Sequence, residues 1–370
     1  MVNVISTQKF DFNDLLIVPE KVTRIQSRYK DVVLPQRLPL MTAPMDTVVN
    51  MNNAHLFNEQ NIGVIIPRTE VKNWLDYLRV LTNANKNGYF ISFGLEMFME
   101  LPEKIKNTKK KVIFNTGDRV VYPKPKRILL DIANGHIDTI IEYCQKLKDI
   151  DKNIEIMVGS IANPETYRWY AESGVVDYVR CGIGAGNGCL TTKNASVGYP
   201  MASLIYECRL IKNELNGDNS TIKPPAIVAD GGMKDYSDII KALGLGADYV
   251  LLGSIFNKAV ESAGDSYYWG IKISPKLAKF LFKRKFKIKK HFRGMSTKTA
   301  QKAMGKTELK TSEGVVRYRP VEYTLSGWVE NFNHYLRNAM SYTNSKTIDE
   351  FVGNVEFCTI TEFAYKRFDK

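Results

Sequence analysis

Residues 154–184 read IEIMVGSIANPETYRWYAESGVVDYVRCGIG, and this stretch decides the fold class. An apolar run stands at each end, and a polar, amphipathic segment separates the two runs. Continuous apolar runs are typical of strands buried on both faces, as in parallel sheets. In the middle segment, Pro164 suits a first helical turn, Asn163 can cap it, and Gly174 can end the helix. The stretch therefore predicts a strand, a helix and a second strand.

Apolar runs of this kind recur from residue 39 onward, and the segments between them mostly resemble helices, as at 136–149 and 235–246. The runs are PLMTAPM (39–45), IGVII (62–66), YFISFGL (89–95), RILLDIA (127–133), IEIMVGSI (154–161), DYVRCGIG (177–184), PAIVADG (225–231) and DYVLLGSIF (248–256). Eight strand–helix units in one series favour a closed (β/α)8 TIM barrel, an α/β fold, over an open doubly wound sheet. Gly244 is suitably placed to end the helix in 235–246.

The chain has 370 residues, whereas such a barrel typically takes roughly 250. We therefore predict one barrel domain over 1–370, with additions. The interval 96–126 is expected to hold a helix and an irregular connection. The interval of about 265–320 is longer than one closing helix requires, so we predict a lid or flap there. This interval contains a basic insertion at 274–291, and residues 321–370 form a C-terminal extension.

The composition, with 44% hydrophobic and 25% charged residues, is that of an ordinary globular protein. Apolar runs stay short of the ~20 residues that cross a bilayer, and the first residues lack the apolar region of a signal peptide. We therefore expect a cytoplasmic protein with no membrane partner. The five cysteines show neither a CxxC pair nor zinc spacing, which argues against a disulfide framework and a structural zinc.

The formal net charge is +13, and much of the excess is local. The segment KRKFKIKK (283–290) carries six basic residues in eight. Phe280, Phe282 and Phe286 interleave with this charge, but no recognisable nucleic-acid module surrounds them. We expect attraction for anions and no nucleic-acid partner.

The densest chemical signal is VRCGIGAGNGCLTT (179–192), in which a glycine-rich loop leads from a strand end to Cys189. Glycines let the backbone turn sharply and approach a ligand or an ion. A cysteine on such a loop is accessible, and nearby amide dipoles can favour its thiolate. A dinucleotide fingerprint normally follows the first strand of its unit and has an acidic residue ~20 positions on. This motif belongs to the sixth unit and ends in cysteine, so we predict a nucleophile instead.

Two further motifs, VADGG (228–232) and LLGSIF (251–256), end the seventh and eighth predicted strands. A carboxylate at a strand end can accept hydrogen bonds from both hydroxyls of a ribose. Glycine-rich turns after these two strands are a frequent phosphate site in such barrels. We predict that Asp230 holds a ribose and that the phosphate is held by Gly232, Gly253 and Ser254. The competing interpretation is a pair of ordinary strand-end turns.

These motifs together resemble the family of inosine-monophosphate dehydrogenases and guanosine-monophosphate reductases. The matching segments, in family order, are FDFNDLLIVPE (10–20), TAPMDTV (42–48), DIANGH (131–136), GIGAGNGCLTT (182–192), GYP (198–200), ADGG (229–232), GADYVLLGS (246–254) and FRGMS (292–296). The resemblance spans residues 10 to about 345, and the cysteine loop is its most specific part.

The resemblance implies a covalent step in which the Cys189 thiolate attacks C2 of a purine nucleoside monophosphate. Reductases expel ammonia from GMP and take a hydride from NADPH to give IMP. Dehydrogenases pass a hydride from IMP to NAD and then hydrolyse the thioimidate to XMP. The family also implies a homotetramer and a monovalent cation, K⁺, held by the backbone carbonyls of Gly184, Gly186 and Cys189.

Site residues follow from the resemblance position by position. The catalytic set is Cys189 with Thr191 and Glu313, the last two handling the proton of the departing amine. The substrate set is Asp230, Gly232, Gly253, Ser254, Met295, Ser296, Met45 and Asn187. The cofactor set is Asp131, Asn134, Ser160, Arg180 and Gly182; the competing interpretation of Asp131 is a buried structural acid.

Several features favour the reductase branch. No regulatory insertion interrupts the barrel, the lid motif ending in TSEG is short, and Arg317-Tyr318 falls after it in a predicted return strand. The leading prediction is therefore NADPH-dependent reductive deamination of GMP. The alternatives are an NAD-dependent IMP dehydrogenase, a related enzyme for another purine nucleotide, and a barrel that binds a nucleotide without catalysis.

The sequence also departs from the family pattern. A His-Lys pair is usual after the second strand, but Ile65-Ile66-Pro67-Arg68 stands there. Arg68 can replace the lysine as a cation, although arginine is a poor proton donor because its pKa is so high. Asn187 stands where a serine is usual, and the family does not need the basic run before FRGMS.

Overall fold

The computed structural model describes residues 8–106, 123–217, 223–309, 311–312 and 314–368. Its centre is a sheet of eight parallel strands in the order β2-β9-β8-β7-β6-β5-β4-β3. The strands are β2 (Leu40–Thr42), β3 (Ile65–Ile66), β4 (Phe90–Phe93), β5 (Arg127–Asp131), β6 (Glu155–Ile161), β7 (Tyr178–Cys181), β8 (Ala226–Asp230) and β9 (Tyr249–Leu252). Each lies within one of the eight predicted runs.

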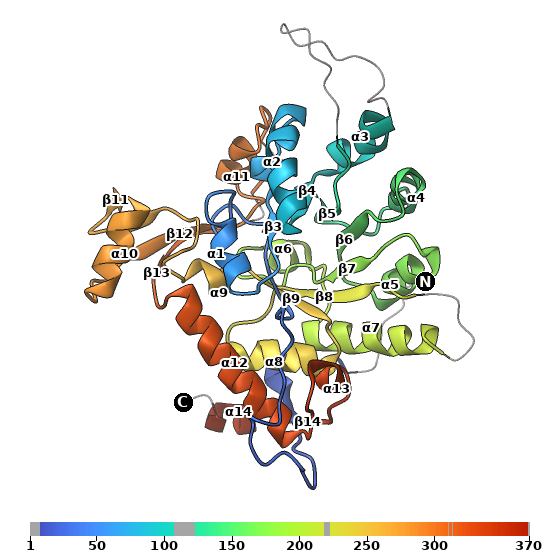
Figure 1. The fold of residues 1–370 in the computed structure, drawn as a ribbon, viewed down its shortest axis with the longest axis vertical. Helices are drawn as coiled ribbons and strands as arrows, with labels where there is room; N and C mark the ends of the chain where they lie inside the picture. Colours follow the sequence, from blue (N-terminus) through green and yellow to red (C-terminus); the bar gives the residue numbers. More distant parts are fainter. Residues whose placement is uncertain (1–7, 107–122, 218–222, 310, 313, 369–370) are drawn as a thin grey trace, which may run out of the picture.

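The sheet closes on itself where β2 meets the segment before β3. Met41 pairs with Gly63 in a parallel bridge, and Gly63 N donates to Leu40 O over 2.8 Å. The predicted (β/α)8 barrel is therefore confirmed. Helices surround the barrel (Figure 1): α1 (Ala54–Glu59), α2 (Trp74–Asn87), α3 (Leu95–Lys106), α4 (Ile140–Ile150), α5 (Pro164–Ser173), α6 (Thr191–Ala195), α7 (Met201–Leu215), α8 (Tyr236–Leu245) and α9 (Ser254–Asn257).

The ends of α5 and α8 show where local signals suffice and where they do not. The Asn163 side chain caps α5 by accepting from Glu165 N, and Gly174 ends it in the left-handed conformation, as predicted. The prediction that Gly244 ends α8 is wrong, because α8 continues to Leu245 and its C-cap is Gly246, with φ 115°. Gly244 is needed for packing instead, since a Cβ there would lie 2.9 Å from Val355 Cγ2.

The interior of the barrel is filled with apolar side chains and is not a pore. A buried cluster takes one residue from almost every strand: Met41, Ile65, Phe90, Leu129, Met157, Val228 and Leu251. Packing of this kind closes the barrel centre, which leaves the loops at the strand ends to form sites. The larger core lies between the strands and the surrounding helices.

The predicted lid interval contains a second sheet, which projects beside the barrel (Figure 1). Its strands run in the order β11-β10-β12-β13. They are β10 (Ser266–Tyr268), β11 (Ile271–Ile273), β12 (Lys289–Arg293) and β13 (Val316–Pro320), accompanied by α10 (Pro275–Lys283) and α11 (Lys298–Ala303). Arg317 and Tyr318 lie in β13, opposite Phe292 and His291, and so belong to the return strand as predicted.

A strand near the start of the described residues pairs with one near their end, beside the barrel (Figure 1). Strand β1 (Leu15–Ile17) pairs antiparallel with β14 (Phe357–Thr359), next to η1 (Phe12–Asp14), α12 (Leu325–Tyr342), α13 (Ile348–Phe351) and α14 (Glu362–Phe368). The helix predicted in 96–126 is part of α3, and residues 107–122 of that interval lie outside the described residues. In the described part of the chain, no helix combines the length and hydropathy of a membrane span.

Candidate active site

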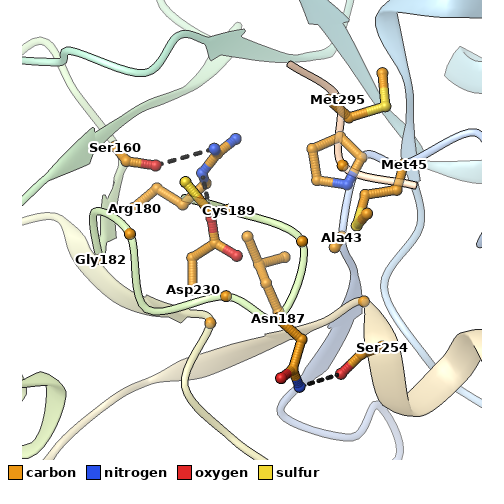
Figure 2. A pocket seen from close by; sticks show the side chains of 18 of the residues that line it. Ala43, Met45, Ser160, Arg180, Gly182, Asn187, Cys189, Asp230, Ser254 and Met295 are labelled. Carbon is orange, nitrogen blue, oxygen red and sulfur yellow. Dashed lines mark hydrogen bonds and ion pairs between the residues drawn. The ribbon is translucent and has the colours of Figure 1, made fainter. Parts of the chain in front are cut away.

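A cavity of about 250 Å³ opens at the carboxyl ends of the barrel strands. Its walls come from the carboxyl ends of β2, β3, β5, β6, β7, β8 and β9 and the segments that follow them, and from the end of β12 and the residues after it. Figure 2 shows side chains from these separate elements turned toward one space. Catalytic groups in such barrels lie at this end of the strands, because the loops there can vary without disturbing the core.

Cys189 lies on this wall, in the loop between β7 and α6, and its side chain is half-buried. Its Sγ lies 3.2 Å from Thr191 Oγ1, and its backbone N donates to Gly186 O over 3.0 Å. The loop depends on glycine at 184, where φ is 75° and an added Cβ would collide with the Thr192 side chain. The loop therefore presents a fixed thiol beside a hydroxyl.

The segments around β12 and β13 lie directly on this loop. Gly188, Gly294 and Gly314 meet there: a Cβ on Gly188 would lie 3.2 Å from Gly294 Cα, and one on Gly314 would lie 3.2 Å from Gly188 O. Cys189 also pairs with Gly314 in an antiparallel bridge. Only glycine permits such close backbone approach. The arrangement holds Met295 and Ser296 on the wall of the cavity.

The predicted phosphate residues lie together in a different part of the cavity wall. Gly253 caps the short helix α9, which begins at Ser254. Asn187 Nδ2 donates to Ser254 Oγ over 3.1 Å, as Figure 2 shows. Gly232, after β8, has φ 88°, which a residue with a side chain rarely adopts. Backbone amides, a hydroxyl and an amide side chain are thus available to an anion.

Two guanidinium groups, those of buried Arg180 and partly buried Arg68, pair with two carboxylates on the cavity wall. Arg180 Nη1 donates to Asp131 Oδ1 over 2.8 Å, and Arg180 Nε lies 3.0 Å from Asp230 Oδ2. Arg180 Nη2 donates to Ser160 Oγ over 3.0 Å (Figure 2). Arg68, from the 3₁₀ turn η2 (Arg68–Glu70) after β3, places its Nε 2.9 Å from Asp131 Oδ2.

The charged side chains of this cluster shift one another's pKa values. Burial alone would raise the pKa of Asp131, but Arg68 and Arg180 outweigh it and lower that pKa. Burial also raises the pKa of Asp230, and the attraction of Arg180 offsets this only in part. The pKa of Arg180 would be lowered by burial, yet the two carboxylates raise it. Arg180 therefore stays charged, and Asp131 is the more firmly ionised of the two acids.

The structure brings most of the predicted site residues to this one cavity. Its lining includes Met45, Asp131, Ser160, Arg180, Gly182, Gly184, Gly186, Asn187, Cys189, Thr191, Asp230, Gly232, Gly253, Ser254, Met295 and Ser296. Asn134 is exposed and lies outside the described lining, because its side chain turns back to accept from His136 N. Glu313 lies outside the described residues.

Some lining residues had no role in the sequence interpretation. Ala43 and Pro44 precede Met45 on the wall, and Phe292 joins them from β12; Figure 2 labels Ala43 and Met45. The motif PLMTAPM contains the first two, so its position at a strand end was the available signal. Arg68 was noted only as a departure from the family pattern, and its ion pair with Asp131 brings it into the site.

The comparisons with known proteins agree with this site. A family model described as "IMP dehydrogenase / GMP reductase domain" matches residues 9–367, and the chain belongs to that family. It is accordingly an oxidoreductase of purine nucleotides, in a family that works with a nicotinamide cofactor.

The chain is similar over nearly its whole length to proteins named GMP reductase. The protein from Caenorhabditis elegans is 29% identical, over 96% of this chain and 92% of its own length. That from Onchocerca volvulus is 28% identical over the same shares. GMP reductase 2 of Mus musculus is 25% identical, over 96% of this chain and 95% of its own length.

Proposed function

We propose that this protein is an NADPH-dependent GMP reductase, which converts GMP to IMP and ammonia through a covalent bond to Cys189. The observation that carries the proposal is the half-buried thiol of Cys189 on the wall of the strand-end cavity, 3.2 Å from a hydroxyl. A thiol so placed is open to a substrate that enters the cavity, unlike the buried cysteines of the core.

In the proposed reaction, the Cys189 thiolate bonds to C2 of the purine. The bond between C2 and the exocyclic amine then breaks, and the amine leaves as ammonia. NADPH supplies the hydride that replaces sulfur at C2, which restores the thiolate and leaves IMP. Covalent catalysis of this kind divides one difficult substitution into two easier steps.

The departing amine needs a proton, and Thr191 and Glu313 are the proposed pair that handles it. The Thr191 hydroxyl is in contact with Cys189 Sγ and so lies next to the proposed reacting carbon. For Glu313, support comes from the following residue, Gly314, whose backbone pairs with Cys189. General acid–base help of this kind contributes typically ~100- to 10,000-fold in rate.

We propose that the nucleotide is held by its sugar and phosphate. Asp230 accepts hydrogen bonds from the ribose, and Gly232, Gly253 and Ser254 donate to the phosphate. Asn187 already donates to Ser254 and can orient that hydroxyl. Met45, Met295 and Ser296 line the same cavity and would flank the base.

The nicotinamide–ribose side of the cofactor is assigned to the wall formed by Asp131, Ser160, Arg180 and Gly182. These groups fit such a ligand because Asp131 and Ser160 offer oxygen acceptors at the cavity wall. We further propose a homotetramer and a K⁺ ion on the cysteine loop. The Gly186 carbonyl accepts from Cys189 N, and its second lone pair can still face a cation. A cytoplasmic location stays a prediction.

The direct test measures reduced cofactor by its absorbance. The protein is mixed with GMP and NADPH, and separately with IMP and NAD, with and without added K⁺. Loss of absorbance in the first mixture is the expected result. A gain in the second mixture with none in the first would establish a dehydrogenase instead. If the absorbance changes in neither mixture although GMP binds, catalysis is refuted and the protein is a barrel that binds a nucleotide without turnover.

A further inference from the structure

The ion pairs on the cavity wall form one continuous chain. It begins at Arg68 after β3, passes through Asp131 at the end of β5 and Arg180 on β7, and ends at Asp230 on β8. The successive N···O distances are 2.9, 2.8 and 3.0 Å. The two middle side chains are each 8% exposed, whereas Arg68 and Asp230 are 24% and 22% exposed. All four residues line the cavity, and the two ends of this chain of ion pairs are the more exposed.

The stability of the fold does not by itself explain this chain of ion pairs. Removing charges from water carries a desolvation cost, and apolar side chains of similar volume often serve a core equally well. The two positive and two negative side chains cancel, so this chain of ion pairs attracts no ligand by net charge. Its arrangement instead fixes directions: Arg180 engages a different neighbour with each of its three nitrogens, which are Asp131, Ser160 and Asp230.

We propose that Arg68 and Arg180 are positioning residues that hold the carboxylates of Asp131 and Asp230 in fixed orientations. Arg68 thereby controls how the pocket holds a ribose without touching the reacting purine. The inference rests on the proposed function in one respect, since it takes Asp230 as the ribose acceptor. Because Arg180 occupies Asp230 Oδ2, the other oxygen of that carboxylate is left for the sugar.

This proposal accounts for the unusual residue at position 68. An arginine there cannot deliver a proton near neutral pH, because a guanidinium group keeps its proton throughout that range. It can, however, supply a charge that persists at every working pH, and its Nε lies 2.9 Å from Asp131 Oδ2. The Arg68 side chain also lies next to Gly94, which follows β4: an added Cβ on Gly94 would be in ordinary contact with Arg68 Nη1, at 3.6 Å.

The test compares Arg68→Met with the wild-type enzyme in equilibrium binding of GMP and of 2′-deoxy-GMP. We expect GMP binding to weaken roughly tenfold, as for loss of one partner from a partly buried charge pair. Binding of 2′-deoxy-GMP should change less, because that ligand lacks one of the hydroxyls that Asp230 receives. Arg127→Met is the matched control: Arg127 pairs with Glu155 at the start of β5, outside the cavity lining, and its loss should leave both affinities unchanged.

The pH dependence gives a readout that a merely structural role would not move. Asp131 faces Arg68 and Arg180, and Asp230 faces Arg180 and Asp131. Loss of Arg68 removes one of two cations that keep Asp131 ionised. In the Arg68→Met variant, GMP binding should therefore decline at a higher pH during acid titration than in the wild type. Arg68→Lys restores a cation and should shift the decline back.

Two results would overturn the proposal: equal weakening of both nucleotides by Arg68→Met, or an unchanged pH profile. Neither depends on turnover, so the outcome is separable from that of the reductase assay. A wild type that binds GMP but oxidises no NADPH refutes the proposed reaction and leaves this test intact. Arg180→Met is unsuitable for this test, because it removes the cation shared by the Asp131 and Asp230 carboxylates, and the variant is expected to fold poorly.

Discussion

Replacement of Cys189 by alanine should abolish turnover and spare the fold. Among the described residues, Cys189 Sγ makes one polar contact, 3.2 Å to Thr191 Oγ1, and such a bond is worth roughly 0.5–1.5 kcal/mol. The backbone of residue 189 is held separately, by its bond to Gly186 O and by its bridge to Gly314. We therefore expect a loss of unfolding free energy below about 1.5 kcal/mol.

Activity should fall far more, by at least roughly a thousandfold, because the nucleophile has no substitute. GMP affinity should stay within about tenfold of the wild type, since sugar and phosphate contacts are untouched. Turnover is followed by NADPH absorbance, binding by equilibrium titration and stability by urea unfolding. Cys358→Ala is the matched control, because that exposed thiol lies on β14. Near-normal turnover in the Cys189 variant would refute the covalent route.

A chemical measurement on the unmodified protein checks the same reasoning. Three cysteines, at 144, 181 and 208, are buried, and burial raises the pKa of the Cys144 and Cys208 thiols. An alkylating reagent should therefore label Cys189 and Cys358. Saturating GMP should protect Cys189 alone; protection of both thiols, or of neither, would place the nucleotide elsewhere.

Further predictions concern the pocket and the fold. Asn187→Ala and Ser254→Ala should each weaken GMP binding, and a double-mutant cycle should give a coupling of roughly 0.5–1.5 kcal/mol, because the two side chains share a hydrogen bond. Burial lowers the pKa of Lys290 to about 8 from 10.5. The unfolded chain thus binds more protons between these values, and Lys290 makes the unfolding free energy rise with pH there, by up to roughly 3 kcal/mol, a rise that Lys290→Met should lack. Tyr167→Phe should cost about 1 kcal/mol in urea unfolding, because it removes a buried hydrogen bond to Pro225 O.

Each of these has an outcome that contradicts it. Additive effects in the cycle would show that Asn187 does not orient Ser254 when GMP is bound. Parallel pH profiles of the wild type and the Lys290 variant would mean that the buried amine does not titrate in this range. Tyr342→Phe, at an exposed position, is the control for Tyr167 and should leave the unfolding free energy unchanged.

The barrel could be predicted from the sequence because its signals are local. Each strand is an apolar run, and Asn163 and Gly174 bound their helix through chemistry within a few residues. Gly244 misled the prediction because its role depends on Val355 and Phe357, more than a hundred residues away. Strands β10 and β11 of the second sheet could not be predicted from the sequence for a similar reason. Strands of three residues are too short to show a periodic pattern of their own.

The site shows the same division. Cys189 and its glycines can be recognised in one continuous motif. The pairing of Arg68 with Asp131 instead joins two segments far apart in the sequence, which the sheet order β5-β4-β3 brings together. Asn134 was assigned to the cofactor from its motif, but a local hydrogen bond to His136 N turns its side chain away. Short-range bonding of asparagine competes with ligand contacts, and the motif alone does not decide between them.

The meeting of Gly188, Gly294 and Gly314 makes the region beyond it modular. Both ends of the intervening stretch contact the loop of the proposed nucleophile, so α11 (Lys298–Ala303) lies between two fixed points. A chimaera that exchanges this part for a shorter or longer one, joined at the same glycines, should keep its thiol in place. Such grafts offer a route to new substrate preferences on an unchanged barrel.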